Sequence, residues 1–374
     1  MRNLLRSSIG SGTAVAGALA LGVLGYGRVA DAACANQSTD VSNDLALECL
    51  VAPRAAKESS DPNLREQSMY RSLMSELSAV MAVPVLEPAD TTGYSGFHFS
   101  FDVNATSISQ NNAYWSGYLQ NGGNRAMAGV RHVSGGFLPV ASLMLRKGVW
   151  FLPLPFFPSL EFGFGASNLL QSSIYGLNGY LKFAIHEGYH DVYVPSIAVR
   201  ASVSRISGTP QVDLTILTVE GIISKAFGAG GTMTFEPYLG GGALFSIVRS
   251  QVIDTAPNVD LYRGPSPPNP NFTMSDALSQ KIVFPTQDNI MRWRVFAGLN
   301  MHYAIVSITG YFSYWGAGAD NAYDISTLPD AANTGPNTGG AAACRTDKRD
   351  NSAICPKDLA YGQFTVGGSV GLRF

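Results

Sequence analysis

The stretch HEGYH, residues 186 to 190, is the first candidate for chemistry because it matches the H-E-x-x-H pattern of zinc hydrolases. In a helix, His186 and His190 would share a face and bind zinc, with Glu187 as general base. The preceding residues alternate as a strand instead, which separates the two histidines by roughly 13 Å. One zinc ion with bonds of about 2 Å cannot join them. We interpret the stretch as a turn between strands and expect no metal site.

Other motifs also fail to supply a catalytic centre. The glycine-rich stretches 227–231 and 239–243 lack the Lys-Ser/Thr pair and the strand-to-helix step of a phosphate loop. His132 has Asn and Ser residues nearby, but no carboxylate pair for acid–base chemistry. We therefore expect no catalytic residue, no cofactor and no enzymatic activity. The net charge of −2 argues against a basic surface for nucleic acid.

The remaining chemistry lies in charges that interrupt alternating segments on one face only. In residues 97–105, every second residue is apolar and the residues between them, Asp102 included, are polar. Similar alternation recurs along the chain, and it places these charges on the polar face: Asp102, Glu161, Lys182, Arg200, Glu236, Arg292, Arg294 and Arg373. Glu220 joins them if its register is the same. Such residues are costly against lipid and ordinary in the lumen of a barrel. They either fill a narrow lumen with ion pairs or form a charged pore constriction.

The alternating segments indicate the fold. They run to about 10–14 residues, whereas strands of soluble proteins usually have about 5–6 and tilted strands need about 9–11 to cross a bilayer. We count about ten, with 8–12 compatible with the pattern. Segments 134–147 and 212–226 fit either register, and we expect a bulge in the second. The sequence predicts an all-β, transmembrane antiparallel barrel over residues 93–374.

The connections between these segments form two classes. The long ones, 108–133, 250–288 and 317–358 among them, all fall at one end of the predicted barrel, as in outer-membrane barrels with long outer loops and short periplasmic turns. An even strand number then puts both termini in the periplasm. We expect aromatic belts near the strand ends, formed by Trp115, Trp150, Trp293, Trp315, Tyr303, Tyr311 and Tyr314.

The first 32 residues predict a secretory signal peptide. Arg2 and Arg6 precede the apolar run 13–27, and Ala30-Asp31-Ala32 supplies an A-x-A cleavage site. The chain is 46% hydrophobic and only 14% charged, against about 25% charged residues in typical soluble domains. This balance favours a membrane protein, although no later apolar run approaches the roughly 20 residues of a spanning helix.

Residues 33–92 form a predicted periplasmic segment with one amphipathic helix. Met69, Leu73, Leu77 and Val80 recur at helical spacing, and prolines follow soon afterwards. We interpret the helix as packed against the rest of the protein. A lumen plug and a partner-binding helix are the alternatives.

The four cysteines form two close pairs in polar segments, Cys34 with Cys49 and Cys344 with Cys355. This spacing predicts two disulfides in an oxidising compartment, with reduced thiols as the alternative. A lipid-modified Cys34 is disfavoured because Asp31 stands where a lipobox has an aliphatic residue.

The chain ends in GQFTVGGSVGLRF, a strand with one oily face and Phe374 as its last residue. As a free edge in water such a strand would invite aggregation. The whole pattern resembles the bacterial outer-membrane β-barrel superfamily, whose final strand and terminal aromatic are read by the barrel assembly machinery. The resemblance covers residues 93–374 as an architecture. It implies an outer-membrane location, with lipid and the assembly machinery as partners.

Two functions fit this reading. The first is a small porin-like channel for polar solutes, with Arg292 and Arg294 as candidates for an anion-favouring constriction. The second is a closed barrel whose outer loops anchor adhesion, envelope structure or the assembly of a complex with surface partners. A transporter for hydrophobic solutes, with the N-terminal helix as a hatch, fits less well because the predicted lumen is so charged.

Overall fold

The computed structural model describes residues 44–51, 62, 64–116, 136–149, 159–187, 194–229, 232–254, 281–324, 345–346 and 353–374. The chain divides into two units, residues 1–30 and 31–374. The first unit, which contains most of the predicted signal peptide, lies outside the described residues, and so do Cys34 and Cys344. The two predicted disulfides therefore stay predictions.

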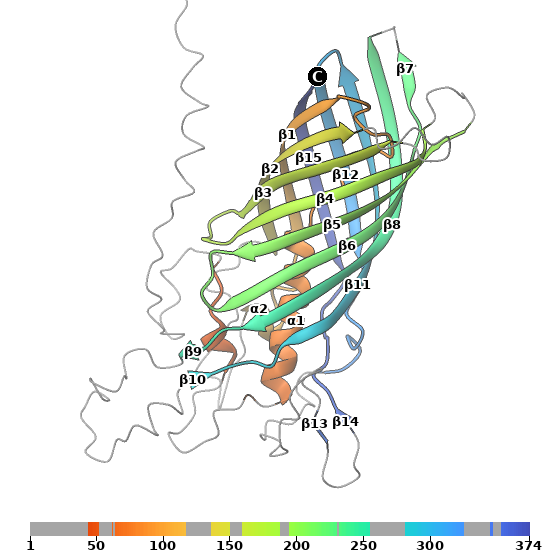
Figure 1. Cartoon of the computed structure of the whole chain (residues 1–374). Coiled ribbons are helices and arrows are strands. Elements are labelled where there is room, and N and C mark those ends of the chain that lie inside the picture. The colour runs from red at the N-terminus through yellow and green to blue at the C-terminus, as the bar shows by residue number, and fades with distance from the viewer. Residues whose placement is uncertain are drawn as a thin grey trace, which may run out of the picture. The chain divides into compact units, whose positions relative to one another are not determined.

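Ten long strands of the described chain form one antiparallel sheet that closes on itself (Figure 1). In chain order they are β1 (Phe97–Ser107), β2 (Phe137–Val149), β3 (Leu160–Leu169), β4 (Tyr175–His186), β5 (Ser196–Ser207), β6 (Val212–Ser224), β8 (Met233–Ser250), β11 (Gln287–Tyr303), β12 (Val306–Trp315) and β15 (Gln363–Arg373). Each pairs with the next, and β15 pairs with β1. The predicted antiparallel barrel of about ten strands is confirmed.

The last strand closes the ring. The backbone N–H of Phe97 donates to the carbonyl of Phe374 at 2.9 Å, and the N–H of Phe374 donates back to Phe97 at 2.8 Å. The edge of the terminal strand is thus paired to its last residue, while the Phe374 side chain stays exposed. This pairing satisfies backbone groups that hydrocarbon could not.

Short strand pairs extend the barrel at its two ends. β7 (Phe227–Ala229) continues the hairpin before β8 at the end where the chain finishes, which we call the short-turn end. At the opposite end, the long-loop end, β9 (Ile253–Asp254) pairs with β10 (Lys281–Ile282), and β13 (Arg345–Thr346) pairs with β14 (Ala353–Ile354). Figure 1 shows these two pairs together at the long-loop end and the C-terminus at the other.

The alternation of each strand separates an exposed apolar face from a buried one. Phe99, Phe101, Leu181 and Val199 are among the many large apolar residues exposed on the outside. The two ambiguous strands are now defined, because Arg146 of β2 and Glu220 of β6 point inward and are buried. The predicted bulge in 212–226 is wrong: β6 keeps a continuous register with both neighbours.

The aromatic residues divide differently from the prediction. Trp293 and Tyr303 are about half exposed on the outside, as a belt requires. Trp115, Trp315 and Tyr311 are instead buried, each less than 7% exposed. Their bulk fills space inside the barrel, so proximity to a strand end was not sufficient to place them against lipid. Trp150 lies outside the described residues.

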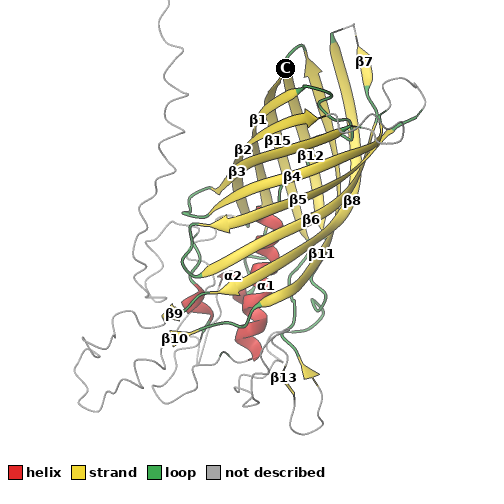
Figure 2. Ribbon diagram, viewed as in Figure 1, coloured by secondary structure: helices red, strands yellow, loops and turns green. Residues whose placement is uncertain are grey.

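Helix α1 (Leu64–Met81) lies inside the ring of strands, where Figure 2 shows it in red. Every residue from Glu66 to Met81 is buried. The chain then continues in extended form to Thr92 and turns at Gly93–Gly96 into β1. Among the described residues, no helix combines the length and apolar character that crossing a membrane requires. Residues 64–92 are therefore part of the barrel interior and not a segment beside it.

The two ends of the described chain lie at opposite ends of the barrel. The 3₁₀ helix η2 (Leu47–Leu50) follows Asp44, whose Oδ1 accepts hydrogen bonds from the N–H (2.7 Å) and hydroxyl (2.9 Å) of Ser173 in the β3–β4 turn. The N–H of Leu47 donates to Gln211 in the β5–β6 turn at 2.9 Å. Both turns belong to the long-loop end, whereas Phe374 ends the chain at the short-turn end. Residues 44–47 thus lie at the long-loop end, whereas the side on which the chain's N-terminus lies stays a prediction.

Candidate functional site: the filled lumen

The half of the lumen nearest the long loops contains a large apolar cluster. Residues of α1 pack there against inward side chains of β2, β6 and β8, and Tyr70 stacks on Phe284 with ring centroids 4.4 Å apart. The cluster includes Met69, Tyr70, Leu73, Met74, Leu77, Leu138, Val140, Leu214, Ile216, Leu244 and Val248. Here the inward faces of the strands are apolar as well as the outward faces. This explains why alternation alone left the inward and outward faces of β2 and β6 undecided.

One face of α1 is lined with serines that hold the loop before β15. The Ser68 hydroxyl accepts from the N–H of Lys357 at 3.0 Å, and the Ser72 hydroxyl accepts from Leu359 at 2.9 Å. Ser75 donates to the Asp358 carboxylate at 2.9 Å. Burial raises the pKa of the Asp358 carboxyl above its ordinary value, while the Arg292 guanidinium acts in the opposite direction. The loop thereby gains partners for backbone groups that have no strand beside them.

Glu76 of α1 is a buried carboxylate held by neutral donors. It accepts hydrogen bonds from the Tyr114 hydroxyl (2.9 Å) and the Trp115 indole of α2 (Ala113–Ser116), and from the backbone N–H groups of Ser109 (3.1 Å) and Tyr361 (3.1 Å). These donors come from the β1–β2 connection and the chain before β15. Glu76 thus joins the helix to two loops at the long-loop end.

Arg71 and Arg292 reinforce this end. Arg71 donates to the side chains of Gln287 (2.8 Å) and Asn289 (2.6 Å) at the start of β11. Arg292 donates to the carbonyls of Gly316 (2.6 and 2.8 Å) and Tyr361 (2.6 Å) and to the side chain of Gln363. Arg292, a candidate for a pore constriction, also donates to the carbonyl of Ser75 in α1 at 3.3 Å and therefore ties the helix to the loops.

The segment after α1 cannot continue the helix because Pro84 and Pro88 restrict their own and the preceding residues to extended backbone. Its carbonyls consequently face the wall, where side chains supply the donors. Pro84 accepts from Arg200 (3.0 Å), Val85 from Tyr238 (2.8 Å), and Pro88 (3.2 Å) and Asp90 (2.9 Å) from Lys182. The negative end of the α1 dipole also points into this cationic region.

Glu87, between the two prolines, is the centre of the charged half. Its carboxylate lies 3.5 Å from Nε of Arg146, 3.6 Å from Nζ of Lys182 and 3.5 Å from Nε of Arg200. The Tyr180 hydroxyl donates to it at 2.7 Å. These four partners stand on three strands, β2, β4 and β5, of which β4 and β5 are adjacent and β3 separates β2 from β4.

Gly163 makes room for Tyr180. A Cβ at that position would lie 2.1 Å from Cε1 of the Tyr180 ring, a distance that no side chain tolerates. The ring lies in turn beneath the Arg200 guanidinium, 4.6 Å from its centroid. The glycine of β3 is thus required for the position of the hydroxyl that reaches Glu87.

Wall carboxylates partner the same cations. Lys182 lies 3.1 Å from Glu161, Arg200 lies 3.6 Å from Glu220, and Arg146 lies 4.0 Å from Asp102. Arg294 contacts Glu220 as well and stacks on Trp315 at 4.7 Å. Buried charges are stable only when paired in this way.

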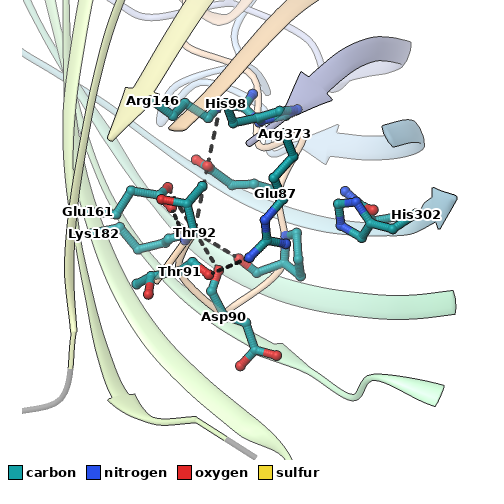
Figure 3. Close-up of a pocket in the computed structure, with 12 residues that line it drawn as sticks. Glu87, Asp90, Thr91, Thr92, His98, Arg146, Glu161, Lys182, His302 and Arg373 are labelled. Atoms are coloured by element: carbon teal, nitrogen blue, oxygen red, sulfur yellow. Dashed lines mark hydrogen bonds and ion pairs between the residues drawn. The ribbon is translucent and has the colours of Figure 1, made fainter. Parts of the chain in front are cut away.

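Residues 64–92, which fill the lumen and which we call the plug, leave it beside a pocket at the short-turn end. Figure 3 draws this pocket. The N–H of Thr91 donates to Glu187 (3.0 Å) and the N–H of Thr92 donates to Glu161 (2.7 Å). Arg373 donates to the carbonyl of Thr91 at 3.0 Å. Glu187 of HEGYH thus holds the plug, and His190 lies outside the described residues. The described residues contain no cluster of three or more candidate metal ligands.

Of the eight charged residues selected from the sequence, the structure buries seven in the lumen and leaves Arg373 half-buried. Glu236 accepts from Ser224 at 2.8 Å, and the same hydroxyl accepts from the N–H of Ala89.

The sequence did not predict the roles of Glu76, Glu87 and Arg146. A carboxylate between two prolines gave no periodic signal, and Arg146 lay in an ambiguous register.

Comparison with protein-family models and with curated proteins gave no match. Comparison with solved structures found a Neisserial surface protein, NspA, at 10% identity and a TM-score of 0.22, covering 74% of this chain and 97% of that one. The translocator domain of the autotransporter NalP from Neisseria meningitidis is 8% identical with a TM-score of 0.32, covering 76% of this chain and 91% of that one. The transport unit of AIDA-I from Escherichia coli is 7% identical, also with a TM-score of 0.32, covering 83% of this chain and 99% of that one.

The closed ring of ten antiparallel strands is established by the strand pairings themselves. At these identities and TM-scores the likeness adds nothing about activity or partners.

Proposed function

We propose that this protein is an outer-membrane barrel closed by its own chain, which anchors the structures at its long-loop end. The observation that carries the proposal is the filling of the lumen by residues 64–92. All of α1 from Glu66 onward is buried, and wall side chains bind the extended segment behind it.

The outer face supports a membrane location. Large apolar residues cover it, among them Leu181, Phe183, Val199 and Phe312, each at least 40% exposed. An exposed apolar surface of this kind is a liability in water and is typical of contact with lipid.

The contents of the lumen favour the closed anchor over the porin-like channel. A porin keeps an aqueous passage, which needs about 16 strands, whereas ten strands here surround a helix. Arg294, the second constriction candidate, is buried against Glu220, Trp315 and the carbonyl of Val83. Both constriction candidates, Arg292 and Arg294, are thus bound by other groups of the described chain.

The topology gives the anchor a direction. If the long loops face outward, the contacts of Asp44 with Ser173 and of Leu47 with Gln211 hold the N-terminal residues at the outer surface. The β9–β10 and β13–β14 pairs would then lie on the outer side as well, while Phe374 faces the periplasm. We propose this arrangement in place of a periplasmic N-terminal segment.

Protease accessibility on intact cells tests which end of the barrel faces outward. A cleavable tag inserted near residue 56 should be cut by protease added outside, and the same tag in the 188–190 turn should be cut only after the outer membrane is permeabilised. Both variants should still migrate differently on a denaturing gel when the sample is not boiled, as a folded barrel does. Cutting of the second tag alone in intact cells would reverse the orientation.

Planar-bilayer recording tests the closure itself. The full chain should show no stable unitary conductance, because residues 64–92 occupy the lumen. Steady openings of a purified, correctly folded sample would favour the porin-like channel.

A further inference from the structure

The wall of the charged half is organised around a single point of the lumen. Arg146, Lys182 and Arg200 come from three strands, β2, β4 and β5, and are each less than 5% exposed. All three side chains reach the same carboxylate, at 3.5–3.6 Å. We propose that the barrel wall contains an anion-binding site, which the Glu87 carboxylate occupies as a tethered ligand and which accepts small carboxylates in its absence.

The charges of the wall support this assignment. Four buried cations, Arg146, Lys182, Arg200 and Arg294, face three buried wall carboxylates, Asp102, Glu161 and Glu220. Four cations share these three ion-paired carboxylates, and Glu87 adds a fourth; the wall carboxylate Glu236 is also buried and accepts a hydrogen bond from Ser224. A buried charge with no counterion is strongly disfavoured. Three of the four cations therefore converge on one carboxylate that comes from outside the wall, that of Glu87.

The two oxygens of Glu87 divide these contacts. Oε1 faces Arg200, while Oε2 faces Arg146, Lys182 and the Tyr180 hydroxyl. Tyr180 also lies 2.8 Å from Glu161, so its one proton serves one carboxylate at a time and Lys182 compensates the other. A site with donors on both oxygens suits a carboxylate such as formate or acetate better than a single-atom ion such as chloride.

The site belongs to the wall and not to the plug. The plug contributes only Glu87 and backbone carbonyls to it, whereas the cations and the hydroxyl stand on β2, β4 and β5. Truncation of the Glu87 side chain should therefore leave the binding groups in place and vacate the position of the carboxylate. The inference goes beyond the anchor role and does not depend on which end of the barrel faces outward.

Chemical rescue of Glu87→Ala in the full chain is the test. The variant should unfold at a lower denaturant concentration than the wild type. Added formate or acetate should raise the unfolding midpoint towards the wild-type value, and the increase should level off at high formate or acetate concentration. Sodium chloride at equal ionic strength should raise it less. If Glu87→Ala folds only poorly, the readout becomes its refolding yield with and without acetate, measured by the gel shift of the unboiled sample.

Glu87→Gln is the matched variant, because it fills the same volume without the charge. It should be destabilised and should not respond to acetate, since no space is vacated. A Glu87→Gln protein as stable as the wild type would overturn the proposal, as would a Glu87→Ala protein that responds equally to acetate and chloride. Either result would leave the protease and conductance tests of the anchor unaffected.

Discussion

The two halves of the lumen hold the same plug by different physics. Around α1 the contacts are mostly apolar, as between Leu73 and the inward faces of the strands, and burial of this kind is non-directional. Residues 82–92 also make apolar contacts, through Val83, Val85, Leu86 and Ala89, but they add ion pairs and hydrogen bonds with fixed partners, such as those of Glu87. We infer that the apolar half supplies cohesion, whereas the charged half fixes the register of the chain in the lumen. Substitutions in the two halves should therefore destabilise the protein in different ways.

The largest effect is expected from Arg200→Met in the charged half. It removes a guanidinium from between Glu87 and Glu220 and leaves both buried carboxylates with fewer partners. Breaking a buried pair costs about 3–5 kcal/mol, to be measured by denaturant unfolding in detergent. Arg205→Met is the control on the same strand: Arg205 is paired with Asp213 but 52% exposed, so the change should cost at most about 1 kcal/mol. Equal effects would remove the distinction between lumen and surface charges.

Leu73→Ala tests the apolar half. Leu73 is fully buried, and its truncation should cost about 2–5 kcal/mol through lost burial and the cavity left behind. Leu73→Met, which nearly conserves volume, should cost less than about 1.5 kcal/mol. The charged half would tolerate no comparable replacement of Arg200. If the methionine variant proved as unstable as the alanine variant in the same unfolding assay, packing at this position would be directional after all.

A smaller loss is expected from Glu76→Gln, at a polar contact within the apolar half. Glutamine keeps one acceptor oxygen but places an NH₂ group against two donors: either Trp115 and Ser109, which now bond Oε2, or Tyr114 and Tyr361, which bond Oε1. The unsatisfied donors should cost about 1–3 kcal/mol. Tyr114→Phe, which removes only one of the donors, should cost less. The reverse order in unfolding experiments would show that the carboxylate is not the element joining the loops to α1.

The smallest effect is expected from Ser72→Ala, which removes the acceptor of the Leu359 N–H. The loss should be about 0.5–1.5 kcal/mol, with faster hydrogen exchange at the Leu359 amide. Ser78→Ala is the matched control, because the Ser78 hydroxyl bonds the carbonyl of Met74 in its own helix. Ser78→Ala should leave the hydrogen exchange of the Leu359 amide unchanged. Equal exchange in both variants would mean that the loop is held by other contacts.

The sequence predicted the wall of this molecule better than its contents. The period of two and the terminal Phe374 were enough for the barrel, because lipid and lumen impose opposite polarity on alternate residues. The same rule failed at Leu138 and Leu214, which are apolar yet inward, because α1 makes that part of the lumen an apolar environment. The helix itself was predicted from its spacing. Its place in the lumen depends on contacts more than 200 residues apart, such as Arg71 with Gln287, and local patterns carry no such information.

Glu87 shows the same limit for the site. Its flanking prolines predicted only the end of a helix, and its partners become neighbours when β2, β4 and β5 close around it. Arg292 shows the converse, since its inward position could be predicted but its role could not. Its bonds run to loop carbonyls, and no periodicity connects β11 with residues 316 and 361.

Hydrogen–deuterium exchange of residues 69–92 in the folded, lipid-embedded protein tests the central claim most directly. A helix and an extended segment enclosed by the barrel should exchange as slowly as the strands around them, because both are shielded from water and opened only by unfolding. We expect protection of the α1 amides comparable to that of β4 and β5. Rapid exchange throughout residues 69–92, with the strands still protected, would contradict the account: the lumen would then not be closed by its own chain.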